Sequence, residues 1–250
     1  MPLACIGAEE LIDHMFHELG ADRGGWLITV NLDFLRRHAY DPSARDLYAR
    51  ADVRVADGMP LVWASRLRGT PLPERVAGSA LVMPICAQAA LEGRSVYLLG
   101  GTPAANQAAA HVLRRKLPGL LIAGNSSPRV SSEPTRQELD AIAVELLAAR
   151  PDIVLVALGS PKQERLIAAL RAELPASWWA GVGISFSFIA GHVKRAPVLL
   201  QRAGLEWLHR LAQEPRRLFR RYVLDDLPFA LALFAGAARE RLSRPRRLAE

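Results

Sequence analysis

Before residue 191, the hydrophobic positions follow two patterns that alternate along the chain. Between residues 9 and 19, apolar side chains recur every three or four positions, which is typical of an amphipathic helix. Short apolar runs instead indicate buried strands at 26–30, 53–56, 95–99, 120–123 and 153–158. Further helical patterns lie at 103–117, 134–149 and 161–173. This alternation predicts an α/β, Rossmann-like fold, a mainly parallel sheet flanked by helices, with ligands at the carboxyl ends of the strands.

The pattern changes after residue 191. Strand signals stop, and short basic helices follow that we expect to be broken at Pro197, Pro215 and Pro228, because proline lacks the N–H that a helix interior needs. The sequence therefore predicts an α/β core over residues 1–191 and a basic helical appendage over residues 192–250.

The net charge of +7 lies entirely in this appendage, which has 13 Lys or Arg against 6 Asp or Glu. Its arginines are interleaved with Leu, Trp and Phe at helical spacing, which favours an anionic membrane surface or a phosphate near one. Nucleic acid is a rival partner, although no nucleic-acid motif is present. The apolar stretch 228–238 is shorter than the roughly 20 residues of a membrane span, so we expect peripheral attachment.

Composition excludes several other classes. With 250 residues, half of them apolar, the chain can bury a substantial core. Its two cysteines lack ligand-like spacing and no secretory signal is apparent, so we expect no zinc site and a cytoplasmic location. The sequence contains neither a Gly-x-Gly-x-x-Gly motif nor a Walker motif, so NAD and ATP are disfavoured and we expect no cofactor. There is no Asp-x-Asp pair to hold a metal ion, so Arg and Lys would have to neutralise any diphosphate.

Polar residues follow the first two predicted strands. Thr29 and Asn31 flank the last position of one strand, and Asp57 follows the next strand in an Asp-Gly pair. Asn31 suits either the N-cap of the following helix or a binding site. Asp57 suits a turn, yet it also falls where a parallel sheet presents functional groups, and its carboxylate could serve there as a general base.

Two further loops carry candidates. Arg75 precedes a helix that we expect to begin at Gly78 or Ser79. Such an arginine is often a solvated loop charge or part of a local salt bridge, and beside a helix N-terminus it also suits a diphosphate clamp. Gly100 and Gly101 resemble a turn from a strand into a helix that opens with a proline.

A polar hexapeptide follows the last predicted strand. Ser160 and Gln163 have the spacing of a capping box around Pro161, which would suit the first helical turn. That interpretation gives no role to Lys162. At a helix N-terminus after a central strand, Lys162, Gln163 and Glu164 would also suit a nucleotide phosphate or sugar, so both interpretations stay open.

Motifs along the chain combine into a wider pattern, in the order Thr29-x-Asn31, Ala56-Asp57-Gly58, Arg75-Val76-x-Gly78-Ser79, Leu98-Leu99-Gly100-Gly101, Gly159-x-Pro161-Lys162-Gln163-Glu164, Gly181-Val182-Gly183, Arg195-Ala196-Pro197, Gly204-Leu205-Glu206-Trp207 and Glu214-Pro215-x-Arg217. Together they resemble the WecG/TagA/CpsF family of bacterial glycosyltransferases. The order and spacing cover roughly residues 10 to 224, which makes the match specific. One position departs from it, because Ser187 stands where relatives commonly have Asp.

The resemblance implies an inverting, metal-independent enzyme that moves a sugar, typically of N-acetylmannosamine type, from a UDP donor to a polyprenyl diphosphate-linked acceptor. Asp57 matches the general base of the family, and Arg75 would stabilise the departing UDP. Substrate-binding roles are expected for Thr29, Asn31, Gly100, Gly101, Lys162, Gln163, Glu164, Arg210, Arg217 and Arg220. The last three match arginines thought to complete the active site at the membrane.

Several alternatives stay open. The donor could be UDP-glucose or a UDP-uronic acid used in exopolysaccharide assembly, and a homo-oligomer is compatible with the sequence. A non-enzymatic reading is a basic protein that binds nucleic acid or a membrane. We favour a cytoplasmic enzyme, peripheral on the inner face of the plasma membrane, whose partners are the UDP-sugar, the lipid-linked acceptor and anionic lipid rather than nucleic acid.

Overall fold

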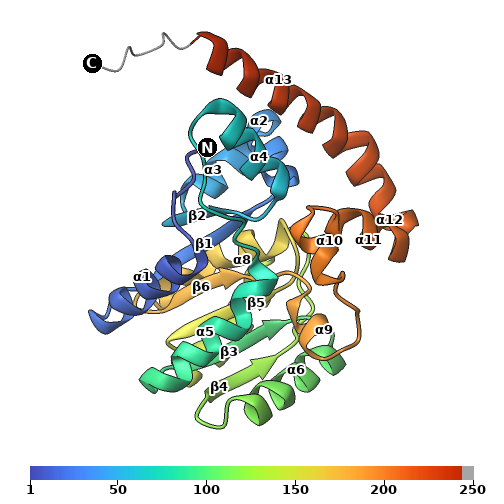
Figure 1. Ribbon diagram of the computed structural model, residues 1–250. Helices are drawn as coiled ribbons and strands as arrows, with labels where there is room; N and C mark the ends of the chain where they lie inside the picture. The colour runs from blue at the N-terminus through green and yellow to red at the C-terminus, as the bar shows by residue number, and fades with distance from the viewer. Residues whose placement is uncertain (244–250) are drawn as a thin grey trace.

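A single parallel sheet organises the molecule (Figure 1). The computed structural model describes residues 1–243, leaving aside the side chains of Val198, Arg202 and Arg217. In spatial order β2-β1-β6-β5-β3-β4, the strands are β2 (Val53–Ala56), β1 (Gly25–Val30), β6 (Trp178–Gly181), β5 (Ile153–Ala157), β3 (Ser95–Gly100) and β4 (Leu121–Ser126). Every pairing is parallel, so the carboxyl ends of all strands meet at one edge of the sheet. The predicted fold class is confirmed.

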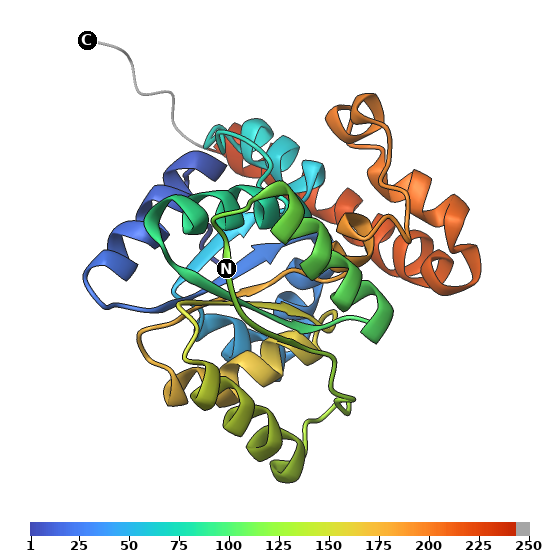
Figure 2. The same cartoon turned by 90° about the horizontal axis from the view of Figure 1, so that it is seen from below.

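Helices cover both faces of this sheet (Figure 2). One face carries α1 (Ala8–Gly20), α5 (Gly78–Glu92) and α6 (Pro103–Lys116), and the other carries α3 (Pro42–Ala49), α7 (Arg136–Ala149) and α8 (Lys162–Leu170). Successive residues of a strand point to opposite faces, so each strand feeds two cores. Leu98 packs in the first core and Leu99 in the second, and Leu155 and Val156 divide in the same way.

The remaining helical elements of the core are α2 (Leu32–Tyr40), α4 (Met59–Arg68), the 3-10 turn η1 (Arg171–Glu173) and α9 (Ser185–Ile189). The predicted helices over 9–19, 103–117, 134–149 and 161–173 correspond to α1, α6, α7 and α8 followed by η1. Gly78 opens α5, as expected.

The central strand β6 is absent from the five predicted strands. It is short, and it pairs with β1 on one side and β5 on the other. Trp178 and Trp179 are each 1% exposed and belong to the two opposite cores. The sequence of this strand, Trp-Trp-Ala-Gly, has no β-branched residue, whereas each of the five predicted runs contains one.

The C-terminal segment, residues 192–243, is helical throughout most of its length. It contains α10 (Val198–Arg202), α11 (Glu206–Gln213), α12 (Pro215–Phe219), the π-helical turn η2 (Arg220–Asp226) and α13 (Leu227–Ser243). Pro197 and Pro215 begin helices, but the predicted break at Pro228 is wrong, because η2 continues directly into α13. The wider π-helical turn accommodates a proline ring that would collide with the carbonyl four residues earlier in an α-helix. Residues 244–250 of the predicted appendage lie outside the described residues.

This segment packs back onto the core through α4. In Figure 1, α10 to α12 lie beyond the carboxyl ends of the strands, and α13 returns along α4. Gly204 has a positive φ of 72°, and a Cβ atom there would approach Met59 Cβ and the Trp63 ring to 2.8 Å. The close approach requires glycine at this position. The C-terminal segment therefore covers the edge at which a parallel sheet binds its ligands.

Candidate active site at the carboxyl ends of the strands

Gly78 brings several predicted site residues together. The backbone N–H of Gly78 donates to Asp57 Oδ2 over a long 3.4 Å, and a Cβ on Gly78 would lie 2.8 Å from Thr29 Oγ1 and 3.4 Å from the Gly181 carbonyl oxygen. A Cβ on Gly181 would in turn meet Gln163 Nε2 at 2.4 Å. Thr29, Asp57 and Gln163 thus surround two glycines at the ends of β1, β2 and β6.

Asp57 is held in an environment that favours its protonated form. The carboxyl is partly buried, and desolvation raises its pKa from 3.8 to about 7, with the nearby Glu206 carboxylate acting in the same direction. Arg75, the Gly78 N–H and Arg195 oppose this rise in the pKa. A carboxyl group with a pKa near neutrality can accept a proton from a bound hydroxyl and release it again.

Arg75 lies between the core and the C-terminal segment. Its Nη1 donates to Glu206 Oε2 of α11 over 2.8 Å, and Arg195 Nε lies 3.7 Å from Glu206 Oε1. We call Asp57, Arg75, Arg195 and Glu206 the Arg75 cluster. Arg75 is therefore neither a solvated loop charge nor part of a local salt bridge, because it is 17% exposed and its partner lies 131 residues away.

Gln163 is fixed from two sides. Its Oε1 accepts from Gly183 N over 3.2 Å, and its Nε2 donates to Glu164 Oε1 over 2.8 Å. Burial raises the pKa of Glu164 to about 6. These two hydrogen bonds fix the orientation of the Gln163 amide, and the buried Glu164 carboxylate holds its Nε2 end.

The capping box predicted for this helix is wrong. The N-cap of α8 is Pro161, without a side-chain hydrogen bond, and the Gln163 N–H donates to the Gly159 carbonyl over 3.0 Å rather than to Ser160. Gln163 uses its amide for Gly183 and Glu164 instead. The cap failed because the proline itself occupies the capping position.

Other predicted site residues have structural partners. Asn31 caps α2, since its Oδ1 accepts from Phe34 N over 3.2 Å. Gly100 and Gly101 both have positive φ at the end of β3, and Gly101 N donates to the Ala157 carbonyl over 2.7 Å. Lys162 Nζ donates to the Val130 carbonyl over 2.9 Å, in the loop after β4. Gly100, Gly101 and Lys162 therefore lie toward the β3–β4 side of the Arg75 cluster.

The appendage arginines differ in their exposure to solvent. Arg210 is half-buried in α11, Arg220 is exposed where η2 begins, and the side chain of Arg217 lies outside the described part of the molecule. The neighbouring Arg221 points inward instead, to Asp33 Oδ2 at 3.4 Å and Asp226 Oδ2 at 3.7 Å.

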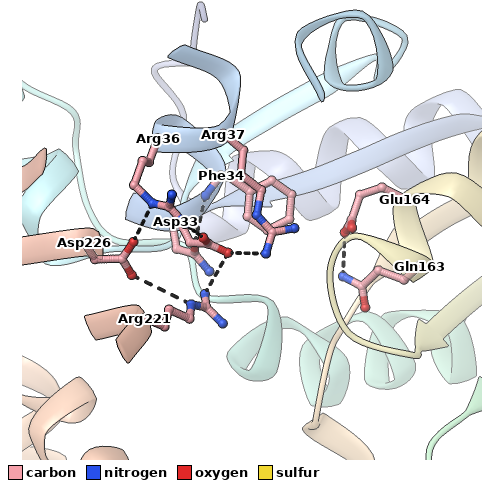
Figure 3. A network of polar contacts seen from close by, with 9 residues as sticks. Asp33, Phe34, Arg36, Arg37, Gln163, Glu164, Arg221 and Asp226 are labelled. Carbon is pink, nitrogen blue, oxygen red and sulfur yellow. Dashed lines mark hydrogen bonds and ion pairs between the residues drawn. The ribbon is translucent and has the colours of Figure 1, made fainter. Parts of the chain in front are cut away.

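Arg221 belongs to a second cluster of charges, shown in Figure 3. We call it the Asp33 cluster, and its members are Asp33, Arg36, Arg37, Arg221 and Asp226. Asp33 on α2 is 1% exposed and pairs with Arg36 at 2.8 Å and Arg37 at 2.9 Å. Burial raises the pKa of Asp226 to about 6, with Asp33 adding to the effect. The cluster links the core to η2.

Sequence reasoning assigned no role to Arg195, Glu206 or Arg221. Arg195 and Glu206 stand in motifs that carried the family resemblance, so a signal for them was present. No sequence signal distinguished Arg221 from the other arginines between residues 216 and 221, because only the helix geometry determines which of them faces the core.

The described residues offer neither a membrane span nor a cluster of metal ligands. Within residues 1–243, no helix combines the length and apolar character needed to cross a membrane. The same residues contain no group of three or more His, Cys, Asp or Glu side chains arranged to hold a metal ion.

Comparison with known protein families agrees with this architecture. The family described as Glycosyl transferase WecG/TagA/CpsF matches residues 1–246, nearly the whole chain. The match includes the strand ends that carry Thr29, Asp57 and Gln163 as well as the C-terminal helices. The chain therefore belongs to the WecG/TagA/CpsF family of glycosyltransferases.

Proposed function

We propose that this glycosyltransferase moves a sugar of N-acetylmannosamine type from UDP to a polyprenyl diphosphate-linked acceptor, with inversion and without a metal ion, in the synthesis of cell-surface polysaccharide. The observation that carries the proposal is the Arg75 cluster. It places a carboxyl group with a pKa of about 7 beside two arginines, at the edge of the sheet where ligands bind.

In the proposed reaction, the Asp57 carboxylate takes the proton from an acceptor hydroxyl. The hydroxyl oxygen forms a bond to the anomeric carbon of the donor sugar while the bond from that carbon to the UDP oxygen breaks. One displacement inverts the anomeric configuration. Arg75 stabilises the negative charge that develops on the departing diphosphate, together with Arg210, Arg217 and Arg220 of the C-terminal segment.

The proposal of metal independence depends on which cations can neutralise the departing diphosphate. The sequence has no Asp-x-Asp pair, whereas Arg75 and Arg195 both stand within 4 Å of the Glu206 carboxylate. Guanidinium groups bind phosphate oxygens through charge-assisted hydrogen bonds. We assign them the role that a divalent cation has in other nucleotide-sugar enzymes.

The remaining site residues are proposed to form the donor pocket. Thr29 and Gln163 flank Gly78 and Gly181 beside Asp57, so they are suited to hydroxyl groups of the sugar. Asn31, Gly100, Gly101, Lys162 and Glu164 border the same edge of the sheet and are proposed to shape the pocket for the nucleotide. Ser187 is a point at which sugar preference could differ from relatives that carry Asp there.

We further propose that residues 192–250 form an appendage that attaches the core, residues 1–191, to the inner face of the membrane. Large apolar side chains are exposed along its helices, namely Leu199, Trp207, Leu208, Phe219, Leu224, Leu227 and Leu231. Exposed basic residues, among them Lys194, Arg216 and Arg220, lie between them in the sequence. Apolar insertion combined with attraction to anionic lipid is the usual basis of such attachment.

The test is transfer by the full chain, using a polyprenyl diphosphate-sugar acceptor in phosphatidylglycerol vesicles and a panel of UDP-sugars, with products identified by mass. Asp57→Asn should lower turnover by about 10²- to 10⁴-fold while UDP binding, measured by calorimetry, persists. Glu173→Gln is the control, because this exposed residue lies before β6, at the opposite end of the strands. Near wild-type turnover of Asp57→Asn would reject Asp57 as the base.

The same assay separates the alternative donors. Preferred transfer from UDP-glucose or a UDP-uronic acid would replace the N-acetylmannosamine assignment without changing the role of Asp57. Equal binding to phosphatidylglycerol and phosphatidylcholine vesicles would contradict an anionic membrane partner.

A further inference from the structure

Glu206 occupies the space between the two arginines of the Arg75 cluster. Each of its carboxylate oxygens faces a different guanidinium group, with Oε2 at 2.8 Å from Arg75 Nη1 and Oε1 at 3.7 Å from Arg195 Nε. The three side chains are largely withdrawn from solvent, with exposed fractions of 15% for Glu206, 17% for Arg75 and 28% for Arg195. The arrangement is a small anion held between two cations.

Arg195 is incompletely satisfied by this carboxylate. Its Nε is buried and has no hydrogen-bond partner among the described residues, and the separation of 3.7 Å from Glu206 is longer than a hydrogen bond. A buried donor without an acceptor is costly. An anion that is larger than a carboxylate, and that carries acceptor oxygens on two linked centres, would reach both arginines at hydrogen-bond distance.

The charges of the cluster balance only while no further anion is present. When all four groups are ionised, Asp57 and Glu206 cancel Arg75 and Arg195. A diphosphate entering beside Glu206 would add at least two negative charges to this partly buried space, and like charges a few ångströms apart repel strongly there. The diphosphate and the Glu206 carboxylate therefore compete for the same cations.

We infer that Glu206 is an internal anion that occupies the diphosphate-binding cations Arg75 and Arg195 in the empty enzyme and is displaced when the diphosphate of the donor binds. The inference rests on the proposed function, since it takes the donor to be a nucleoside diphosphate-sugar. It adds Arg195 to the groups that contact the diphosphate. It also makes α11, which begins at Glu206, the element that responds to occupancy of the site.

Calorimetry with the full chain tests this without turnover. Inorganic pyrophosphate and UDP are the probes, titrated at fixed ionic strength into the wild type, Glu206→Gln, Arg195→Gln and the charge-matched control Glu173→Gln. Because Glu206→Gln removes the competing charge, it should bind both probes about tenfold more tightly than the wild type. Arg195→Gln should bind them about tenfold more weakly, and Glu173→Gln should match the wild type.

A gain of affinity is the informative direction, because loss of a merely structural contact would weaken binding. Glu206→Asp offers a second route should Glu206→Gln fold poorly, as judged by its circular dichroism melt. The shorter carboxylate retreats from Arg75 and should give a smaller gain in affinity.

The possible outcomes distinguish failure of the Glu206 inference from failure of the proposed transferase function. Binding of UDP to Glu206→Gln that equals or falls below that of the wild type overturns the displacement of Glu206 and leaves the transferase proposal standing. Tighter binding of pyrophosphate to Glu206→Gln without any binding of UDP supports the anion site but contradicts the UDP donor. If neither probe binds to any variant, both proposals fail.

Discussion

Two clusters of charged side chains join the C-terminal segment to the core, and they are built in different ways. In the Asp33 cluster, a carboxylate that is 1% exposed is surrounded by arginines from both parts of the chain, at 2.8, 2.9 and 3.4 Å. In the Arg75 cluster, Asp57 has one long hydrogen bond of 3.4 Å and a pKa raised to about 7. In the first cluster three arginines crowd one carboxylate, although Asp33 Oδ2 and Arg221 Nε make no hydrogen bond of good geometry within the described residues. In the second, the acid has a single long hydrogen bond and Arg195 Nε has none within the described residues.

The difference indicates which cluster holds the structure together and which is reserved for a ligand. A carboxylate that already has three close arginines has little left to offer a substrate. Groups that stay underpaired lower the stability of the fold and can be satisfied when the substrate arrives. The comparison predicts opposite effects on stability when a carboxylate is removed from each cluster.

The largest effect is expected in the Asp33 cluster. Asp33→Ala removes the carboxylate that Arg36, Arg37 and Arg221 share and leaves only Asp226, which pairs with Arg36 and Arg221. The free energy of unfolding should therefore fall by about 3 kcal/mol. Urea unfolding of the full chain, followed by circular dichroism, measures this change.

The control for this substitution is Asp140→Ala. Asp140 pairs with Arg136 at 3.6 Å on the surface of α7, where the two side chains are 67% and 92% exposed. Its loss should change the free energy of unfolding by less than about 0.5 kcal/mol. Equal losses for Asp33→Ala and Asp140→Ala would show that the Asp33 cluster does not hold the C-terminal segment in place.

An intermediate effect of opposite sign is expected for Asp57→Asn. The pKa of Asp57 is raised in the folded state from 3.8 to about 7, so the folded protein binds this proton more tightly than the unfolded chain. The wild type therefore loses stability as pH rises from about 4 to about 7. The asparagine variant escapes that loss and should be more stable by about 1–2 kcal/mol at pH 8, a value reduced from the full linkage because Asp57 is partly exposed.

Denaturant unfolding at pH 4 and pH 8 measures this difference. Most of the gain should be lost near pH 4, where wild-type Asp57 is protonated in the folded protein and only partly ionised in the unfolded chain. A variant that is both more stable and inactive would mark Asp57 as a group kept for chemistry. A loss of stability at pH 8 would mean instead that the ionised carboxylate is already well accommodated.

Local patterns predicted much of this architecture. The stripe of α1, the runs that form β1, β2, β3 and β5 and the Asn31 cap depend on neighbours within a few residues, where sequence spacing is informative. The Asp57, Thr29 and Gln163 grouping also followed, because parallel strands bring their carboxyl ends together.

The features that the sequence did not predict depend on contacts between residues far apart in the chain. Nothing local shows that Arg75 pairs with Glu206, 131 residues away, or that Arg221 rather than Arg220 faces α2. Strand β6 was missed because its four residues lack the β-branched side chains of the predicted runs, and the break at Pro228 was wrong because a π-helical turn precedes that residue. Local preference is overridden in each case by packing between segments far apart in the chain.

The smallest effect is expected at the far end of α13. Arg68 of α4 and Glu240 pair there, but the side chains are 50% and 51% exposed, and water screens such pairs. Glu240→Gln should lower the free energy of unfolding by no more than about 0.5 kcal/mol in the same urea assay. Because Ala230 and Ala237 of α13 are each 6% exposed, apolar packing rather than this pair would then fasten α13 to the core. A loss of about 2 kcal/mol would make this pair a third structural link beside the Asp33 cluster. The contrast between the Asp33 and Arg75 clusters would then no longer describe how the C-terminal segment is attached.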